Sequence, residues 1–349
     1  MRKIKSTSQR LKPIIKNLAA RVLCMTGLAS YHIKKRSKGR ALILSYHHVI
    51  PRKKIEEGNV MPGMYLSSEA FERGIGWLKK NFTLVSLEEI IEKIDSGIPW
   101  KDQLCAITFD DGWDDVYTYA FPILKKNDVP ATVFLVGGLA RSDRLNCFDS
   151  CFELALRCKD ERVKISGVEE IDAIIWNREI TDKREKARRA IHTLRSLPYD
   201  TFMLACNDLT RYFESHFDVA SLKDKYKMLS TDNMKKMGKE KIDFGYHSKN
   251  HYMLTQVPDS ILDDELIIPT EEYLSAGINL KPLFCYPDGK YNEKIISALK
   301  KHKYGGAVSL RKGYNNCNTD LFALRRVNIH EGNAGRLSLF LATIGVLNK

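Results

Sequence analysis

Short runs of apolar residues recur in two parts of the chain, and each run ends in polar residues, glycine or proline. Runs of about four to eight such residues are typical of buried strands. The runs cover residues 41–49, 83–85, 104–109, 131–136, 242–246, 283–286 and 324–330. Stretches with helical periodicity lie between them, and Ser86 and Glu89 have the spacing of a capping box. Strands that alternate with helices predict an α/β fold with a parallel sheet, and the number of units suits a barrel.

A charged stretch over residues 141–227 interrupts this alternation, and it is rich in helix-forming residues and lacks strand patterns. Within it, residues 182–196 are strongly basic and have a helical pattern. We therefore expect a helical insertion over 141–227, flanked by one barrel made of residues 41–140 and 228–349. The insertion could shape a substrate cleft or dock a partner, and a structural elaboration without a direct role explains the pattern equally well.

Positive charge is concentrated at the start of the chain. The formal net charge is +13, but residues 1–40 hold 12 Lys or Arg and no acidic residue, which leaves 44 basic and 43 acidic residues beyond them. A nearly neutral folded part argues against a nucleic-acid partner. Residues 11–31 have an amphipathic helical pattern, so residues 1–40 are predicted to be a basic arm that contacts a membrane surface peripherally. A helix packed on the fold and a poorly matching signal peptide are the alternatives, and no run reaches the ~20 apolar residues of a membrane span.

The eight cysteines form no Cys-x-x-Cys motif and suggest no disulfide framework. In a chain of 349 residues this favours free thiols and a reducing compartment. A cytoplasmic location, with peripheral membrane contact, is therefore predicted, and secretion is less favoured. The spacing of Cys147, Cys151 and Cys158 fits helix packing better than a metal cluster.

The apolar run 104–109 ends in two adjacent carboxylates and a glycine, Asp110, Asp111 and Gly112. Parallel α/β folds carry their reactive side chains at this end of the strands. Because neighbouring side chains of a strand point in different directions, one carboxylate can bind a metal while the other acts as a base. A solvated turn explains these three residues equally well when they are taken alone.

A second predicted strand ends near His247 and His251, which are four residues apart. If a helical turn begins at His247, both imidazoles lie on one face and can bind one ion. A carboxylate and two imidazoles with open positions for water form a usual hydrolytic metal site, suited to zinc and also to cobalt, iron or nickel. A coincidental pair at a solvated helix start is the alternative.

The order Thr-Phe-Asp-Asp-Gly at 108–112 and His-Ser-x-x-His at 247–251 resembles the polysaccharide deacetylases, which are the NodB-homology enzymes of carbohydrate esterase family 4. The resemblance covers about residues 40–140 and 228–335. It implies a distorted (β/α) barrel of the glycoside hydrolase–deacetylase type and a divalent metal cofactor, with zinc as the first choice.

The resemblance also implies roles for individual residues. It makes Asp110 the catalytic base. The metal ligands that it implies are Asp111, His247 and His251. The segment Tyr-His-x-Val that begins at Tyr46 resembles the branch that deacetylates poly-N-acetylglucosamine exopolysaccharides, in which the order of motifs is circularly permuted and this histidine is the general acid. That role falls on His47, with His48 or His330 as alternatives, and Tyr46 is expected to contact the substrate.

Residues 283–289 resemble the family's Arg-x-Pro-x-Gly motif, with Cys285 at the Arg position and an Asp where a Tyr is usual. In the family this Arg orients the base, and the backbone beside the Pro helps to hold the oxyanion. The residues therefore expected to line the substrate site are Tyr286, Pro287 and Gly289. Arg325 and Arg326 are consecutive in a predicted strand, so one must point inward. We expect Arg326 to supply the missing charge beside Asp110.

These expectations predict a hydrolase that removes N-acetyl groups from an N-acetylated sugar or a surface polysaccharide. The first alternative is a deformylase or amidase that acts on a lipid-linked or non-sugar substrate. The basic arm is compatible with this alternative, because lipid-linked substrates lie at a membrane. The second is a glycan-binding relative without catalytic activity. A glycosidase needs two carboxylates that flank a bond, and this does not account for the histidines.

Overall fold

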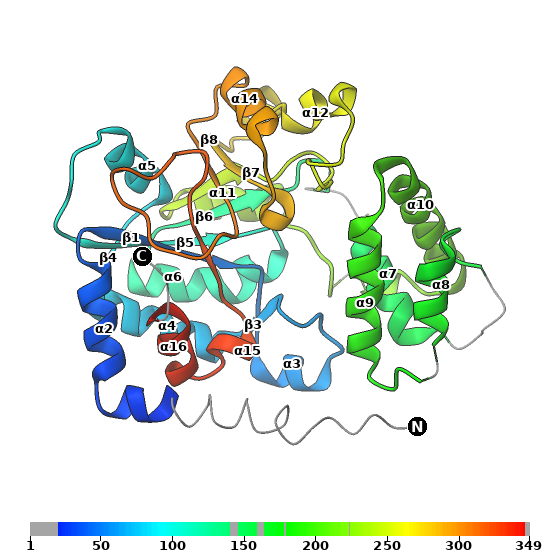
Figure 1. Cartoon of the computed structure of the whole chain (residues 1–349), viewed down its shortest axis with the longest axis horizontal. Coiled ribbons are helices and arrows are strands. Elements are labelled where there is room, and N and C mark those ends of the chain that lie inside the picture. The colour runs from blue at the N-terminus through cyan, green and yellow to red at the C-terminus, as the bar shows by residue number, and fades with distance from the viewer. Residues whose placement is uncertain (1–19, 140–145, 159–163, 178, 223, 346–349) are drawn as a thin grey trace.

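A computed structural model gives the structure of the chain and describes residues 20–139, 146–158, 164–177, 179–222 and 224–345. Its centre is a curved, parallel eight-stranded sheet with the strand order β10-β1-β5-β6-β7-β8-β9, and β4 pairs with the start of β5 (Figure 1). The strands are β1 (Arg40–Tyr46), β4 (Thr83–Leu84), β5 (Gln103–Phe109), β6 (Ala131–Leu135), β7 (Ile242–Tyr246), β8 (Leu280–Cys285), β9 (Gly306–Val308) and β10 (Val327–Asn328). The predicted α/β fold with a parallel sheet is therefore confirmed.

Few contacts close the barrel between its two outermost strands, β9 and β10. Between β9 and β10, a single bridge joins Val308 to Leu324, and the Ser309 N–H donates to the Leu324 carbonyl at 2.8 Å. A second, small sheet of β2 (His48–Ile50) and β3 (Tyr65–Ser67) lies beyond the end of β1. The carboxyl ends of the central strands consequently face a wide opening.

Amphipathic helices cover the outer surface of the sheet, and their apolar faces fill the core. Around the barrel these helices are α3 (Arg52–Glu57), α4 (Ser68–Asn81), α5 (Leu87–Asp95), η1 (Val116–Ala120), α6 (Phe121–Asn127), α11 (Thr231–Gly238), α12 (Asp259–Leu266), α13 (Thr270–Ser275), η3 (Pro287–Gly289), α14 (Glu293–Lys301), α15 (Glu331–Ala334) and α16 (Leu337–Gly345). The predicted capping box is present at α5, where the Glu89 N–H donates to Ser86 Oγ at 3.1 Å and the Ser86 N–H donates to Glu89 at 3.0 Å.

The segment between β6 and α11 forms a helical unit beside the barrel, drawn in green in Figure 1. Its helices are α7 (Cys147–Arg157), α8 (Glu169–Trp176), α9 (Lys183–Ser196), α10 (Tyr199–His216) and η2 (Ala220–Leu222). Helix α7 packs against α9 and α10, and the four long helices enclose an apolar core to which Trp113 and Met253 of the barrel also contribute. The insertion therefore shares its hydrophobic core with the adjacent part of the barrel.

The cysteine prediction is wrong for one pair. Cys147 at the start of α7 and Cys206 in α10 form a disulfide, with their Cα atoms 5.2 Å apart. The two residues are separated by 59 positions, so only the packing of α7 against α10 brings them together. A disulfide is typical of oxidising compartments rather than of the reducing one that we predicted from the spacing. The location of the protein stays a prediction.

Residues 1–19 of the predicted membrane-binding arm, 1–40, lie outside the described residues. Helix α2 (Leu28–Ser37), at the end of the arm, packs against α16 through buried Ala29 and Ile33. This part of the arm matches the alternative of a helix packed on the fold. Among the described helices, none is long and apolar enough to cross a membrane, and contact of the arm with a membrane surface stays a prediction.

Candidate active site

The predicted site residues meet at the carboxyl ends of β1, β5, β7 and β8, because these strands are parallel and adjacent. The Asp110 N–H donates to the Tyr46 carbonyl at 2.9 Å, which extends the pairing of β5 with β1 to the edge of the sheet. A cavity of about 720 Å³ opens there. Residues of the barrel form one wall, and residues of α7 and α9 form the other.

Three potential metal ligands lie together at the bottom of this cavity. Asp111 Oδ1 is 3.5 Å from Nε2 of both His247 and His251, and all three residues lie in the cavity lining. These distances are too long for hydrogen bonds. Ligands about 2.0–2.2 Å from a tetrahedral zinc ion stand at comparable separations from one another. The three side chains therefore fit a divalent cation.

Neighbouring groups fix the orientation of His247 and Asp111, whereas Nδ1 of His251 has no hydrogen-bond partner among the described residues. His247 Nδ1 donates to the Cys285 carbonyl at 2.7 Å, so its Nε2 keeps the lone pair that a metal needs. The Trp113 indole N–H donates to Asp111 Oδ2 at 3.0 Å, which leaves Oδ1 directed at the histidines. Burial, and then the neighbouring His247, lowers the pKa of His251 to about 4. His251 is therefore neutral at pH 7, as a metal ligand must be.

The predicted helical turn at His247 is wrong. The segment after β7 is a loop in which Ser248 and His251 have φ values of 62° and 58°. Ser248 Oγ accepts from the His251 N–H at 2.9 Å, and buried Glu265 of α12 accepts from both the N–H and the side-chain amide of Asn250, at 2.9 and 2.6 Å. Hydrogen bonds to these polar side chains, rather than helical periodicity, bring the two imidazoles together.

The candidate base Asp110 lies beside this group and is held by an arginine. Arg326 contacts both carboxylate oxygens, at 2.6 and 2.9 Å, and both side chains are almost fully buried. Burial opposes ionisation of Asp110, but Arg326 and then His47 outweigh it, so the Asp110 pKa is held well below its usual range. Arg326 also donates to Cys285 Sγ at 3.0 Å. The guanidinium of Arg326, the residue just before β10, therefore lies between Asp110 and the Cys285 side chain.

The candidate acid His47 also lies beside Asp110. Its Nε2 is 3.9 Å from Asp110 Oδ2, and its Nδ1 is buried without a partner among the described residues. Burial lowers its pKa, and the charges of Asp111 and Asp110 oppose this shift. His48 instead contacts Asp115 at 2.6 Å and stacks on Tyr65, which suits a structural role. The other alternative, His330, accepts from the Gly332 N–H at the start of α15.

The structure contradicts part of the expected substrate contact. Tyr46 is 1% exposed and packs against Phe71 and Phe109 in the core, because it lies on the face of β1 opposite to His47. Tyr286 does line the cavity, but its backbone N–H donates to the Val308 carbonyl at 3.2 Å and is not available to an oxyanion.

Pro287 and Gly289 form the turn η3 rather than the wall of the cavity. A Cβ on Gly289, whose φ is 68°, would lie 2.6 Å from the backbone of Leu310. Their function is to shape the turn that presents Tyr286 and Asp288 to the cavity.

The sequence analysis missed the residues that the insertion contributes. Phe148 and Asp149 of α7 line the cavity, together with Arg188, His192 and Arg195 of α9. The basic pattern of residues 182–196 was visible in the sequence, but nothing in it indicated which face of α9 would turn toward the barrel.

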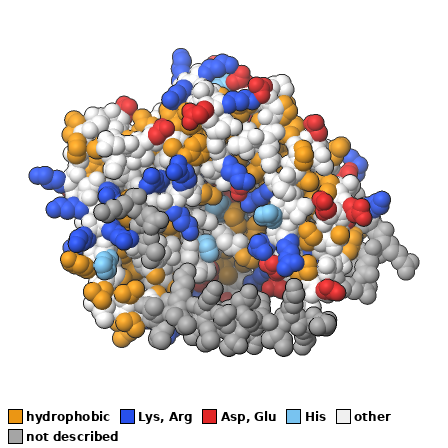
Figure 2. Space-filling model, viewed as in Figure 1, with side chains coloured by type: hydrophobic (Ala, Val, Ile, Leu, Met, Phe, Trp, Pro, Cys, Tyr) orange, Lys and Arg blue, Asp and Glu red, His pale blue; other side chains and the backbone are white. Residues whose placement is uncertain are grey.

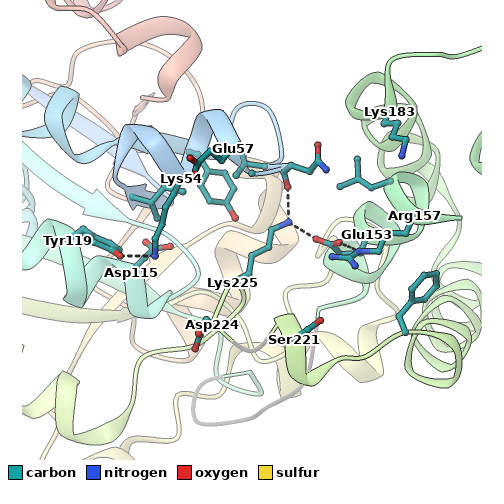
Figure 3. Close-up of a pocket in the computed structure, with 17 residues that line it drawn as sticks. Lys54, Glu57, Asp115, Tyr119, Glu153, Arg157, Lys183, Ser221, Asp224 and Lys225 are labelled. Carbon is teal, nitrogen blue, oxygen red and sulfur yellow. Dashed lines mark hydrogen bonds and ion pairs between the residues drawn. The ribbon is translucent and has the colours of Figure 1, made fainter.

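A second cavity of about 840 Å³ lies beside the first, between α3 and the insertion. Figure 3 shows Lys225 pointing toward Glu153, with Arg157 contacting the same carboxylate from the other side. Lys54 of α3 donates to the Tyr119 hydroxyl of η1 at 2.9 Å, on the barrel side of the cavity. Lys225 also donates to the Asn59 carbonyl at 2.7 Å, and this contact links the insertion to the barrel.

Comparison with known proteins finds similarity around the two carboxylates. Residues 98–167 match the sequence profile of the family described as polysaccharide deacetylase. A poly-β-1,6-N-acetyl-D-glucosamine N-deacetylase of Staphylococcus epidermidis is 30% identical over 110 residues, which are 29% of this chain and 38% of that protein. YxkH of Bacillus subtilis, whose name describes it as a polysaccharide deacetylase, is 33% identical over 107 residues, 30% of this chain and 35% of that protein. Over this part, the chain is similar to polysaccharide deacetylases. The aligned part spans little more than a third of the length of these relatives.

Solved deacetylase structures share the fold. The Streptococcus pyogenes deacetylase PplD superposes with a TM-score of 0.55 and 17% identity, over 88% of this chain and 99% of that chain. IcaB from Ammonifex degensii gives a TM-score of 0.52 and 16% identity, over 88% and 98% of the two chains. The curved parallel sheet with flanking helices is therefore the barrel of the deacetylase type that the sequence predicted.

Proposed function

We propose that this protein is a metal-dependent hydrolase that removes N-acetyl groups from the sugars of a polysaccharide. One observation carries the proposal, namely that a three-residue cation site, Asp111 with two histidines, lies directly beside an ionised carboxylate held by a buried arginine. A water molecule and an amide carbonyl can meet between these two groups. The similarity to the N-deacetylase of Staphylococcus epidermidis supports the same reaction.

The residues that would hold the metal are Asp111, His247 and His251, and zinc suits their chemistry best, with cobalt, iron or nickel as alternatives. A divalent cation in this place supplies Lewis acidity to the amide carbonyl and to an attacking water. The buried surroundings strengthen that effect because they lower the local dielectric constant.

Asp110 is the proposed base that takes the proton of the water. Arg326 keeps it ionised and fixes both of its oxygens, which orients the carboxylate but also makes it a weaker base. The reaction therefore depends on a water that has been made more acidic than bulk water. This requirement explains why the base and the cation site are adjacent.

His47 is the proposed acid that gives a proton to the leaving amine. Because its pKa is lowered, His47 is neutral in the resting protein at pH 7 and must gain a proton during the reaction. Asp110, 3.9 Å away, is the nearest source once it has taken a proton from the water. In this scheme one water is consumed, acetate leaves with the oxygen of the water, and the amine leaves with the proton.

Two other functions make different predictions. A deformylase or amidase of the same fold would hydrolyse a formylated or lipid-linked substrate faster than an N-acetylated oligosaccharide. A glycan-binding relative without activity would bind oligosaccharides but release no acetate, even with a divalent metal present.

The decisive experiment measures metal content and acetate release from N-acetylglucosamine oligomers for the wild type and Asp110→Asn. We expect one divalent metal per chain in both proteins and a loss of activity of about 10²- to 10⁴-fold in the variant, as for removal of a general base. Asp128→Asn, at an exposed carboxylate remote from the cavity, is the control and should behave as the wild type. Absence of acetate release from a metal-loaded wild type would contradict the proposal.

A further inference from the structure

Basic side chains gather around the active-site cavity. Arg188, His192 and Arg195 follow one another at intervals of four and three residues in α9, which places them on one helical face, and all three line the cavity. Lys290 lines it from the barrel side, just after η3. Figure 2 shows Lys and Arg side chains beside the hollow in the middle of the face viewed.

The carboxylates nearby do not neutralise these charges one for one. Asp288 is shared by two cations, since Arg195 and Lys290 both contact it at 3.2 Å. Glu185 is likewise shared by Arg188, at 2.8 Å, and Arg189, at 2.9 Å. Each carboxylate therefore balances half of the positive charge around it. The rim of the cavity keeps an excess of positive charge.

The excess of positive charge lies close to the proposed catalytic groups. The Arg195 guanidinium lies over the ring of Phe148, 5.1 Å from its centroid, and the same ring is 6.2 Å from the His251 ring. Arg195 is thus separated from a proposed metal ligand by a single aromatic side chain. A group bound by this arginine would belong to the acetylated sugar itself or to its immediate neighbour.

Of the other carboxylates that line the cavity, Asp110 is paired with Arg326 and Asp111 belongs to the proposed metal site. The third is Asp149. Asp149 is 7% exposed, and one of its oxygens has no partner among the described residues. Burial, and then the charge of Asp111, raises its pKa, which favours the neutral form. A neutral carboxyl can hydrogen-bond to a sugar hydroxyl without repelling an anion.

We propose that the cavity binds an acidic N-acetylated glycan, with a phosphate or carboxylate next to the acetylated sugar held by Arg188, Arg195 and Lys290. The inference rests on the proposed deacetylation and specifies its substrate class. Guanidinium groups form paired hydrogen bonds with both kinds of anion, and a partly buried site strengthens them. A neutral polymer offers no anion to pair with the positive charge that Asp288 and Glu185 leave unbalanced.

The test compares three acetylated oligosaccharides of equal length, one neutral, one with a phosphate diester and one with a uronic acid beside the acetylated sugar. For the wild type, we expect kcat/KM to be at least about tenfold higher for one acidic substrate than for the neutral one, the effect of a charge-assisted hydrogen bond. Added salt should reduce this preference, because it screens partly exposed charges. The acidic substrate that is preferred identifies the anion as phosphate or carboxylate.

Single substitutions then locate the anion. Arg188→Gln and Lys290→Gln should each lower the ratio of acidic to neutral kcat/KM about tenfold, mainly through KM. The matched control is Arg189→Gln, because Arg189 contacts the same Glu185 but does not line the cavity, and the ratio should stay at the wild-type value. Equal kcat/KM for acidic and neutral substrates would overturn the inference and leave the proposed function standing. If none of the three substrates released acetate, the proposed function would fail with it.

Discussion

At the scale of single residues, Arg326 replaces a charge that the sequence motif lacks. Cys285 stands where the motif that residues 283–289 resemble would have an arginine, and Arg326 reaches the Asp110 carboxylate from near β10. Its guanidinium also donates to Thr108 Oγ1 at 3.1 Å and to the Ser309 carbonyl at 3.0 Å, so its position is fixed on several sides. The function of a motif residue can thus pass to another strand of the barrel.

We expect Arg326→Gln to lower kcat at least about 100-fold, because Asp110 loses its orientation and its buried charge is left unpaired. Breaking one side of a buried ion pair costs about 3 to 5 kcal/mol, so the melting temperature should fall as well. Acetate release, metal content and calorimetry measure these effects, and Arg325→Gln is the neighbouring control. Arg326→Lys should recover part of the stability but little activity, since a single ammonium group lacks the planar fork that holds Asp110 while also bonding Thr108 and the Ser309 carbonyl. Activity of Arg326→Gln within threefold of the wild type would exclude this role.

At the same scale, Tyr46 marks a limit of sequence reasoning. The first strand is apolar at nearly every position and buried on both faces, so it has no alternation that shows which side chains face the site. Asp110 and Asp111 were placed correctly at the strand end because an apolar run that stops abruptly in charged residues fixes that position. Side-chain direction in such a strand depends on its neighbours in the sheet.

At the scale of elements, α12 supports the metal site through the loop between His247 and His251. Glu265 is fully buried and accepts hydrogen bonds from both donors of Asn250, with each of its oxygens used. Its amide analogue has only one acceptor oxygen, so Glu265→Gln leaves one of these donors facing an amide N–H. The loop then loses one of the hydrogen bonds that hold His251 in place.

We therefore expect Glu265→Gln to weaken metal binding about 10- to 100-fold, the usual effect of removing a group that orients a ligand. Competition with a chromogenic chelator measures the Kd directly and does not depend on activity. Asp264→Asn is the matched control, because this neighbouring carboxylate contacts Lys249 at the surface, at 2.9 Å. Unchanged metal affinity in Glu265→Gln would show that the loop is held in other ways.

The elements also explain which predictions the sequence could support. Apolar runs and capping patterns identified α5 and every strand of the central sheet except β9, since these depend on residues close together in the chain. Strand β9 has only three residues, Gly306–Val308, and they form no distinct apolar run. The disulfide between Cys147 and Cys206, and the face of α9 that covers the cavity, depend on packing between helices far apart in sequence. No local pattern encodes such contacts.

At the scale of the whole molecule, the active-site cavity has one wall from the barrel and one from the insertion, so the contacts between these two parts determine its shape. Lys225 is central to them, because its ammonium donates to the Asn59 carbonyl near α3 at 2.7 Å and to Glu153 of α7 at 2.5 Å (Figure 3). Tyr226 and Arg157 contact the same carboxylate, at 2.7 and 2.6 Å. The Glu153 side chain is only 1% exposed.

These contacts predict how stability depends on pH. Burial opposes ionisation of Glu153, but Lys225 and the hydrogen bonds around it outweigh burial and lower its pKa. A carboxyl with a lower pKa in the folded than in the unfolded protein stabilises the fold above the unfolded pKa of about 4.3, and this stabilisation is lost as the pH falls through the folded pKa. Glu153→Gln should therefore lower the free energy of unfolding by about 1 to 3 kcal/mol at pH 7. The difference from the wild type should shrink steadily as the pH falls below about 4.

Urea unfolding at a series of pH values measures this difference in the free energy of unfolding. The control is Asp224→Asn, at an exposed carboxylate of the same cavity. A difference that stayed constant from pH 7 to the acid limit would mean that the shape of the side chain, and not its charge, holds the insertion against the barrel.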